Sequence, residues 1–388
     1  MTDIGPRAGR PSVVVLHRVQ PLTTDLRGVT EGRVVVLTTD APSAVSRADI
    51  PAPADVMQLP ADQWATRIRS WATDGDVQVV TNDEYSLADL AEIRDALGLD
   101  RVTPALLDRY LDKVAMKQAL QDAEIAVPTW HLLPTLSVEL ALPDDLGFPC
   151  VVKPRVGANS RGVRVLRSSD EWLSWLSRHS GETDWEVEEF VSGQMCFVDG
   201  LVTHGHYCPV LVGRYVGGLL PTPDTRIFGA VDVPPGQDLH DDAIALGARV
   251  ARALGTDGRF ATHLEFFETG ERLVVMEVCA RAPGAMVSEM ARVVSGHNLE
   301  SAHLQIQAGL PAPAFHTTGR HAAWISLLGR PRQNLQPPPT LSSALTLHRL
   351  PAKPGHFGRY VSAIGLLVND DHRALSEDLA KCAGHCWF

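Results

Sequence analysis

Three short valine-rich segments in the first hundred residues constrain the fold of this chain most strongly. Short apolar runs occur at residues 13–16, 34–37 and 77–80, the last interrupted by Gln78. Such runs are typical of strands covered on both faces, as in a parallel sheet. Helices are predicted near residues 61–73 and at 86–98, where the second helix opens with a capping box and ends at a glycine. The alternation predicts a doubly wound α/β lobe, and no G-x-G-x-x-G follows a strand to indicate a dinucleotide site.

Composition excludes several classes of protein. The chain has 388 residues, which suggests two or three packed lobes, and its 45% hydrophobic residues are typical of a folded protein. The net charge is −11 and no Lys/Arg run offsets it, which argues against a nucleic-acid partner. The apolar run near the N-terminus is too short for a secretory signal, and no stretch approaches a membrane span. We therefore expect a cytoplasmic protein with no membrane association.

The six cysteines indicate reduced thiols rather than a metal centre. They form no C-x-x-C pair. The tail residues Cys382, His385 and Cys386 could bind a metal, but they supply only three ligands at a terminus. Free thiols are the favoured interpretation.

A single helix is predicted to begin at the N-cap Thr103 and the N1 residue Pro104. Its apolar face carries Leu107, Leu111 and Val114. Lys113 and Lys117 lie one turn apart on a different face.

A predicted strand that ends in a lysine precedes a polar loop bounded by glycines. Residues 148–154 contain Lys153 near the strand end, residues 157–162 form the loop, and residues 163–166 resemble a return strand. Glycines let loop N–H groups cradle phosphate oxygens, and a nearby lysine adds a positive charge. The pattern is not a Walker A motif, because no Lys-Ser/Thr pair follows the second glycine. A plain hairpin with a surface lysine is the alternative.

Two glutamates lie on neighbouring predicted strands, at residues 262–267 and 273–278. Glu277 stands among valines and a methionine, and a carboxylate buried in such surroundings is costly unless it is paired or metal-bound. With Glu265, it would offer the hard oxygen ligands that suit Mg²⁺. The alternatives are a solvated strand face and a buried ion pair with Arg281.

Arg281 precedes Ala-Pro-Gly284 at the predicted start of a helix. Arginine presents a rigid fork that matches carboxylate or phosphate groups, and a glycine near a helix start allows an anion to approach. Taken alone, this pattern is more often a plain turn.

Together and in this order, the features resemble the ATP-grasp superfamily over roughly residues 112–310. The shared series runs through Asp112-Lys113, Lys153, the glycine-rich loop, residues 187–191, His263-x-Glu265 and Glu277-x-Cys279-x-Arg281. Asn82-Asp-Glu-Tyr85 and Arg281-Ala-Pro-Gly284 are similar to the amino-acid ligase branch, which includes carnosine-synthase-like enzymes.

The resemblance implies an α/β fold that is α+β in its catalytic part. An N-terminal doubly wound parallel-sheet domain would span residues 1–105 and a C-terminal α/β subdomain residues 311–388. The ATP-grasp domain between them, residues 106–310, would divide into a smaller nucleotide-binding subdomain at 106–190 and a metal- and substrate-binding subdomain at 191–310.

The resemblance also implies the cofactors, ATP and Mg²⁺, with Mn²⁺ as a substitute. Lys113 and Lys153 would contact the nucleotide phosphates, with Lys153 also near the adenine. Residues 157–162 would form a flap over the phosphates, with Ser160 and Gly162 among its cofactor contacts.

A hinge beginning at Glu188 would hold the adenine, with the backbone of Glu189 and Val191 at its edge. The family commonly has an acid for the ribose shortly after the hinge glycine, but Gly193 is followed here by Gln194.

Glu265 and Glu277 would hold one or two Mg²⁺ ions, and Arg281 would bind the developing acyl phosphate or the substrate carboxylate. The family usually has an asparagine at the position of Cys279. A neutral thiol is a poor Mg²⁺ ligand, so the second metal position departs from the pattern.

The function implied is that of an ATP-dependent carboxylate–amine ligase, which forms an amide or peptide bond through an acyl phosphate. It would join a small-molecule carboxylate to an amine, with amino acids or related metabolites as candidates, and the resemblance suggests a homodimer. The alternatives are a nucleotide-binding protein without turnover and an ATP-grasp enzyme with another acceptor, such as a carboxylase. Arg214 and Arg226, in the segment 210–233, could bind a carboxylate or be ordinary surface charges.

Overall fold

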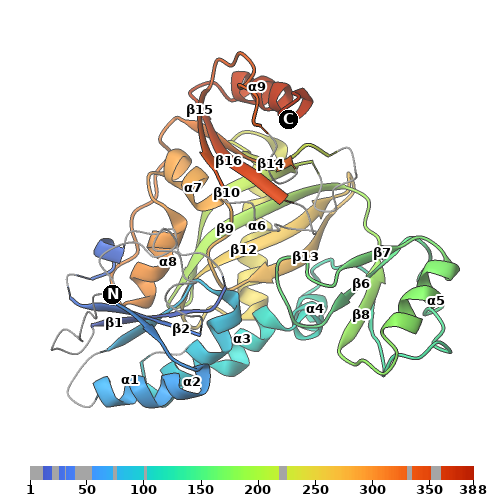
Figure 1. Cartoon of the computed structure of the whole chain (residues 1–388), viewed down its shortest axis with the longest axis horizontal. Helices are drawn as coiled ribbons and strands as arrows, with labels where there is room; N and C mark the ends of the chain where they lie inside the picture. The colour runs from blue at the N-terminus through green and yellow to red at the C-terminus, as the bar shows by residue number, and fades with distance from the viewer. Residues whose placement is uncertain are drawn as a thin grey trace.

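A computed structural model describes residues 12–19, 26–30, 32–39, 55–72, 77–99, 103–217, 225–329, 334–350 and 360–388. Three sheets form a mixed α/β fold, one of them parallel and two antiparallel (Figure 1). The predicted fold class is therefore confirmed.

The N-terminal lobe, at the lower left of Figure 1, contains a four-stranded parallel sheet in the order β3-β2-β1-β4. Its strands are β1 (Val13–His17), β2 (Val34–Thr38), β3 (Asp55–Gln58) and β4 (Gln78–Val80). Its helices are α1 (Trp64–Ala72) and α2 (Leu87–Leu97), with short 3₁₀ turns at Leu26–Gly28, Ala61–Gln63 and Glu84–Ser86. Strands β1 and β2 are buried along their whole length, as the continuous apolar runs predict. The predicted position Thr73 of α1 lies outside the described residues.

A second, smaller lobe projects at the right of Figure 1. It has an antiparallel sheet in the order β5-β8-β6-β7 and the helix α5 (Ser169–Arg178). Its strands are β5 (Trp130–Leu132), β6 (Cys150–Pro154), β7 (Arg164–Leu166) and β8 (Trp185–Glu189). Three tryptophans on α5 and β8, Trp172, Trp175 and Trp185, fill a separate core. The predicted strand–loop–strand hairpin is confirmed as β6 and β7.

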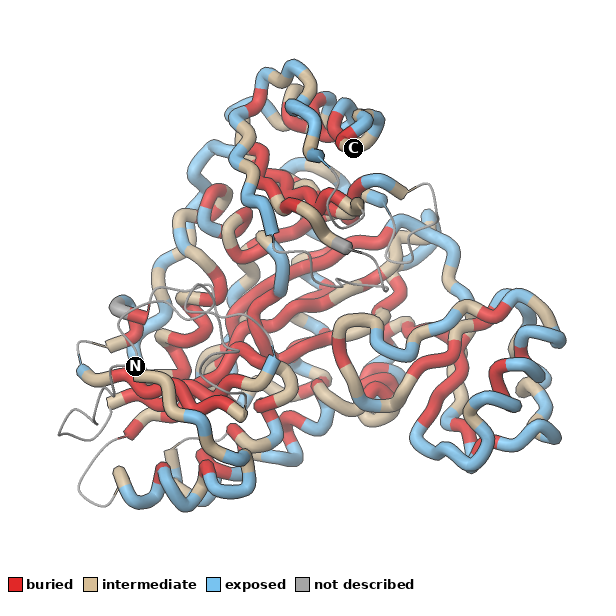
Figure 2. The backbone as a smooth tube through the Cα atoms, in the orientation of Figure 1, coloured by how far each residue is buried: buried red, intermediate tan, exposed pale blue. Residues whose placement is uncertain are grey.

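The central sheet has eight strands in the order β13-β12-β9-β10-β11-β14-β16-β15. Its strands are β9 (Gln194–Thr203), β10 (His206–Val216), β11 (Ile227–Asp232), β12 (Arg259–Glu268), β13 (Leu273–Cys279), β14 (His321–Gly329), β15 (Ala344–Arg349) and β16 (Tyr360–Asn369). Its helices are α6 (Asp238–Leu254), α7 (Val287–Ser295), α8 (Leu299–Gln307) and α9 (His372–Gly384). Figure 2 shows buried residues running along its central strands.

The predicted single helix after Thr103 is wrong, because an extended residue divides it into α3 (Pro104–Leu111) and α4 (Lys113–Asp122). Asp112 has φ −94° and ψ 109°, and its carboxylate accepts the N–H groups of Val114 and Ala115. The same carboxylate forms a two-pronged ion pair with Arg155. A new helix therefore begins at Lys113, whose side chain is buried beside the small lobe.

Packing separates the small lobe from the rest of the molecule. The N-terminal sheet, α3, α4, α6 and one face of the central sheet share a single hydrophobic cluster, whereas β6, β8 and α5 have their own. The small lobe therefore meets the central sheet across a boundary rather than through a common core. Within the described ranges, no helix is long and apolar enough to cross a membrane.

Candidate active site

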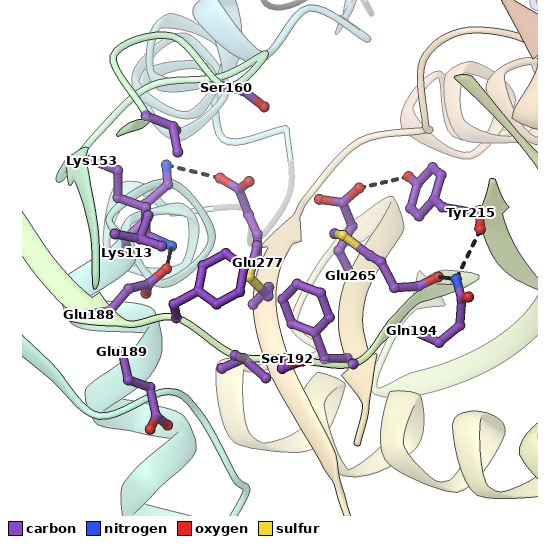
Figure 3. A pocket seen from close by; sticks show the side chains of 18 of the residues that line it. Lys113, Lys153, Ser160, Glu188, Glu189, Ser192, Gln194, Tyr215, Glu265 and Glu277 are labelled. Atoms are coloured by element: carbon purple, nitrogen blue, oxygen red, sulfur yellow. Dashed lines mark hydrogen bonds and ion pairs between the residues drawn. The ribbon is translucent and has the colours of Figure 1, made fainter. Parts of the chain in front are cut away.

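A cleft of about 570 Å³ lies at the boundary between the small lobe and the central sheet. Its lining includes eight of the predicted site residues, namely Lys113, Lys153, Ser160, Glu188, Glu189, Val191, Glu265 and Glu277. Gly162 and Arg281 lie outside this lining. Figure 3 shows the two lysines on one side of the cleft and Glu265 on the other, with Glu277 between them.

Four alternating charges are buried beneath the small-lobe wall of the cleft. Lys117 donates to Glu186 Oε1 at 2.9 Å and to Glu188, and Lys153 Nζ lies 2.7 Å from Glu188 Oε1. Burial acts to raise the pKa of Glu188, but the two lysines outweigh it and lower that pKa to about 2. Burial acts to lower the pKa of Lys153, but the two glutamates hold that pKa above its ordinary value. The predicted phosphate lysine is thus a charged group fixed by its neighbours.

Replacing Lys117 with methionine is expected to destabilise the protein by about 3–5 kcal/mol, because it leaves an uncompensated carboxylate in the interior. Urea unfolding measures the change. Adding Glu186→Gln to the Lys117→Met variant should restore much of the loss, since charges of both signs are then removed. The exposed neighbour Gln118, replaced by methionine, is the control on the same helix. A loss for Lys117→Met no greater than for this control would contradict the buried-network interpretation.

Lys113 links the two walls of the cleft. Its Nζ donates to the carbonyl oxygen of Gly157 at 2.8 Å and lies 2.9 Å from Glu277 Oε1. Burial acts to lower the pKa of Lys113, but the Glu277 carboxylate outweighs it and holds that pKa above its ordinary value. The ammonium group of Lys113 therefore lies next to Glu277, the carboxylate that is predicted to bind a metal ion.

Glu265 and Glu277 lie directly opposite each other on β12 and β13. Residues directly opposite in an antiparallel pair project from the same face of a sheet, so both carboxylates reach the cleft. The Glu277 side chain is partly buried, at 28% exposure, and it pairs with Lys113 rather than with Arg281. Two carboxylates on one face present the hard oxygens that Mg²⁺ prefers, so these residues fit that ion.

Behind Glu265 lies a polar cluster, of which His263 belongs to the motif series named from the sequence. The Tyr215 hydroxyl donates to Glu265 Oε1 at 2.7 Å, and His263 Nε2 lies 3.4 Å from the same oxygen. His263 Nδ1 is 2.6 Å from Asp199 Oδ1. Burial acts to lower the pKa of His263, but the two carboxylates outweigh it and raise that pKa to about 10. His263 is therefore an imidazolium at neutral pH.

The raised pKa of His263 predicts a stability that falls in alkaline solution. A group whose pKa is raised on folding stabilises the protein fully below its unfolded pKa of about 6.5, and this contribution is lost as pH rises toward about 10. For one group the slope is at most about 1.4 kcal/mol per pH unit. Urea unfolding of metal-free wild type and His263→Gln at pH 6.5 and 9.5 measures it. The wild type should lose more stability than the variant, and parallel losses would contradict the assignment.

Arg281 is buried against the N-terminal lobe rather than open to the cleft. Its Nε and terminal nitrogen each lie 2.8 Å from Glu84 Oε2. Ligand atoms of Glu84, Glu277 and Cys279 lie within 4.8 Å of one another, which places the Arg281–Glu84 pair beside the cleft. Burial raises the pKa of the Cys279 thiol well above its ordinary value, so the thiol is neutral. Residues 82–85 are similar to the family signature, but nothing in their sequence indicates that Glu84 pairs with Arg281.

The predicted flap at residues 157–162 is a tight loop with an unusual backbone. Asn159 and Ser160 both have positive φ, at 58° and 53°. Gly162 has φ 77°, and a Cβ there would lie 2.7 Å from Pro154 Cγ, so a side chain would be both strained and crowded. Backbone strain of this kind concentrates at ligand clamps and switch regions.

The predicted hinge, which begins at Glu188, offers a backbone donor next to apolar walls. Within the described ranges, the N–H of Val191 has no hydrogen-bond partner. The N–H of Glu189 instead donates to the carbonyl of Thr129 at 2.9 Å, so only its carbonyl is left for a ligand. The surrounding apolar lining is formed by Phe190, Met195, Phe267 and Met276.

The remaining candidate residues, Arg214, Arg226 and the tail cysteines, do not meet at one site. Arg214 pairs with Glu268 at 3.1 Å, and Arg226 is exposed. Residues 218–224 of the segment 210–233 lie outside the described residues. The tail cysteines are free, and no metal-binding group among the described residues contains them.

Comparison with curated proteins finds moderate similarity, and no family model matches. The uncharacterised protein y4rH of Sinorhizobium fredii is 28% identical over 265 residues, which are 65% of this chain and 53% of that protein. A formate-dependent phosphoribosylglycinamide formyltransferase of Pseudomonas savastanoi is 28% identical over 218 residues, 53% of this chain and 52% of that protein. The chain thus spans about half the length of these relatives.

Solved structures match almost the whole chain. The L-amino acid ligase of Bacillus licheniformis has a TM-score of 0.71 at 17% identity, with 97% of this chain and 98% of that one covered. N5-carboxyaminoimidazole synthetase of Staphylococcus aureus complexed with ADP has a TM-score of 0.71 at 14% identity, with 96% of each chain covered. These similarities confirm the ATP-grasp resemblance at the level of the fold.

Proposed function

Starting from its ATP-grasp fold, we propose that this protein is an ATP-dependent carboxylate–amine ligase that forms an amide bond through an acyl phosphate. The observation that carries the proposal is the composition of one cleft. It contains two buried lysines and two carboxylates on one face of the central sheet, and the Arg281–Glu84 pair lies beside it. Phosphoryl transfer needs positioning and cations more than covalent groups, and this cleft offers both.

The nucleotide would lie with its adenine at the hinge and its phosphates toward the lysines. Val191 offers a free N–H to the adenine edge, and Phe190 and Phe267 are among the apolar residues that would cover the ring. Lys153 is fixed by Glu188, and Lys113 stands beside Glu277 at the opposite wall. The neighbour that contains ADP supports ATP as the cofactor.

Glu265 and Glu277 would hold Mg²⁺. When bound, the ion would neutralise charge on the phosphate oxygens. Lys113, whose ammonium group lies 2.9 Å from Glu277 Oε1, would bind a phosphate oxygen. The neutral Cys279 offers no hard ligand, so these two carboxylates would be the only acidic strand ligands at the site.

The ligation reaction would proceed in two steps. A carboxylate oxygen of the first substrate attacks the γ-phosphorus, the bond to the β-phosphate oxygen breaks, and ADP leaves. The amine of the second substrate then attacks the carbonyl carbon, phosphate leaves, and the nitrogen loses a proton. Arg281 would bind the oxygens of the acyl phosphate, and the flap at 157–162 would exclude water.

The Arg281–Glu84 pair favours an amino acid as one substrate. A guanidinium matches a carboxylate, and a neighbouring carboxylate matches an ammonium group, so the two side chains are complementary to a zwitterion. In the structure they are 2.8 Å apart and satisfy each other. The amino-acid ligase among the structural neighbours also supports this substrate class.

Two other functions have specific support. The synthetase among the neighbours favours an enzyme with another acceptor, as in the carboxylase-like alternative. Cys279, in place of the asparagine usual in the family, favours nucleotide binding without turnover.

The test is to incubate the protein with ATP, Mg²⁺ and a panel of single and paired amino acids while following ADP, phosphate and product mass. A product at the summed mass of two amino acids less water is the expected result. ADP release that depends on bicarbonate instead would favour the carboxylase-like alternative. ATP binding with no ADP across the panel would overturn the ligase proposal in favour of binding alone, and Cys279→Asn would then be tested for gain of turnover.

A further inference from the structure

Tyr215 controls one of the two oxygens of Glu265. Its hydroxyl donates to Oε1 at 2.7 Å, and His263 Nε2 approaches that same oxygen at 3.4 Å. Oε2 has no hydrogen bond to any residue in the described part of the chain. The Tyr215 hydroxyl is thus hydrogen-bonded to Oε1, and His263 Nε2, which lies 3.2 Å from that hydroxyl, makes a longer ionic contact to the same oxygen. The oxygen Oε2 is available to a ligand in the cleft.

The aromatic ring of Tyr215 is held in place by packing. It stacks on Phe228 with ring centroids 5.5 Å apart and planes 14° apart, and it contacts Phe197 at 5.2 Å. Its side chain is buried, at 8% exposure. The hydroxyl cannot swing away from Glu265 without disturbing this aromatic cluster.

Glu277 is restricted in a similar way on the opposite strand. Its Oε1 lies 2.9 Å from Lys113 Nζ. Each carboxylate of the pair thus has one oxygen engaged by the protein. The restriction on Glu277 comes from Lys113, which has a long and flexible side chain. The restriction on Glu265 comes from a packed aromatic ring, so only the Glu265 carboxylate is held rigidly.

We propose that Tyr215 is a positioning residue that restricts Glu265 to binding a cation through one oxygen, and that it thereby makes the site selective for Mg²⁺ over Ca²⁺. Mg²⁺ demands near-octahedral geometry with single oxygens at about 2.0–2.1 Å, whereas Ca²⁺ takes about 6–8 oxygens and often both oxygens of a carboxylate. A carboxylate with only one oxygen available suits Mg²⁺, whereas it deprives Ca²⁺ of a second ligand oxygen. The inference rests on the proposed function, because it places the cation at Glu265 and Glu277.

The test is Tyr215→Phe, which keeps the ring and removes only the hydroxyl. Calorimetry with a non-hydrolysable ATP analogue gives the Kd for Mg²⁺ and for Ca²⁺ in the wild type and in the variant. The ratio of the Ca²⁺ Kd to the Mg²⁺ Kd should fall about tenfold in the variant, as expected for the loss of one hydrogen bond to a charged group. The carboxylate stretching bands in the infrared spectrum of the Ca²⁺ complex should also shift from a one-oxygen to a two-oxygen pattern.

Tyr207→Phe is the matched control, because Tyr207 lies on the same strand but does not line the cleft. It should leave the ratio unchanged. If Tyr215→Phe does not fold, His263→Gln removes the ionic contact to Oε1 and the charged neighbour of the Tyr215 hydroxyl, and it should shift the ratio in the same direction. An unchanged ratio in a folded Tyr215→Phe protein overturns this inference alone, whereas a wild type that binds neither ion with the analogue overturns the proposed function as well.

Discussion

Glu277→Gln is expected to reduce substrate-dependent ADP release by about a hundredfold or more, because it removes a charged metal ligand from the cleft. Glutamine preserves the shape of the side chain, so the strand pairing of β12 and β13 should persist. The substitution also removes the carboxylate that holds Lys113 at 2.9 Å. A coupled assay for ADP, with saturating ATP and Mg²⁺, measures the effect.

The matched control for this variant is Glu271→Gln, an exposed glutamate in the turn that joins the same two strands. It should retain wild-type turnover. Calorimetry with a non-hydrolysable ATP analogue should show weakened Mg²⁺ binding in Glu277→Gln alone. Undiminished ADP release by Glu277→Gln would mean that Glu277 does not hold the metal, whatever the identity of the substrates.

Arg281→Ala is expected to lower kcat by about a hundredfold to a thousandfold while changing the Kd for the ATP analogue by less than about threefold. The guanidinium is paired with Glu84 and lies outside the lining of the nucleotide cleft, so its loss should affect nucleotide binding little. Its proposed role is to bind the acyl phosphate or the substrate carboxylate. Single-turnover assays and calorimetry measure the two quantities separately. Arg272→Ala, at an exposed arginine in the β12–β13 turn, is the control.

Because Arg281→Ala leaves the Glu84 carboxylate without its ion pair, a second variant separates chemistry from stability. Arg281→Lys keeps a positive charge beside Glu84 but loses the rigid fork. It should fold like the wild type and still show a reduced kcat. Equal losses of turnover and analogue binding in both variants would argue against a role for Arg281 in the chemical step.

The sequence by itself determined the features whose causes are local. Continuous valine runs predicted the buried strands β1 and β2, because a strand covered on both faces needs apolar side chains at every position. The glycine-bounded loop after Lys153 predicted the β6–β7 hairpin. The placement of Glu265 and Glu277 on adjacent strands also followed, since a short turn at Thr269-Gly270 joins those strands and brings two acids into register.

Only the tertiary structure decided what those residues contact. Arg281 and Glu84 are separated by 197 positions, and no periodicity within a helix or strand relates them. Helical periodicity predicted that Lys113 and Lys117 lie on one helix, on a face other than its apolar face. In the structure the predicted helix is interrupted at Asp112, and both lysines are buried beside glutamates. Each buried ammonium group is paired with carboxylates, Lys113 with Glu277 and Lys117 with Glu186 and Glu188, and folding alone brings these charges together. Tyr215 likewise acquires its contact to Glu265 only when β10 and β12 lie in the same sheet, because hydrogen bonds depend on distance in space and not on distance along the chain.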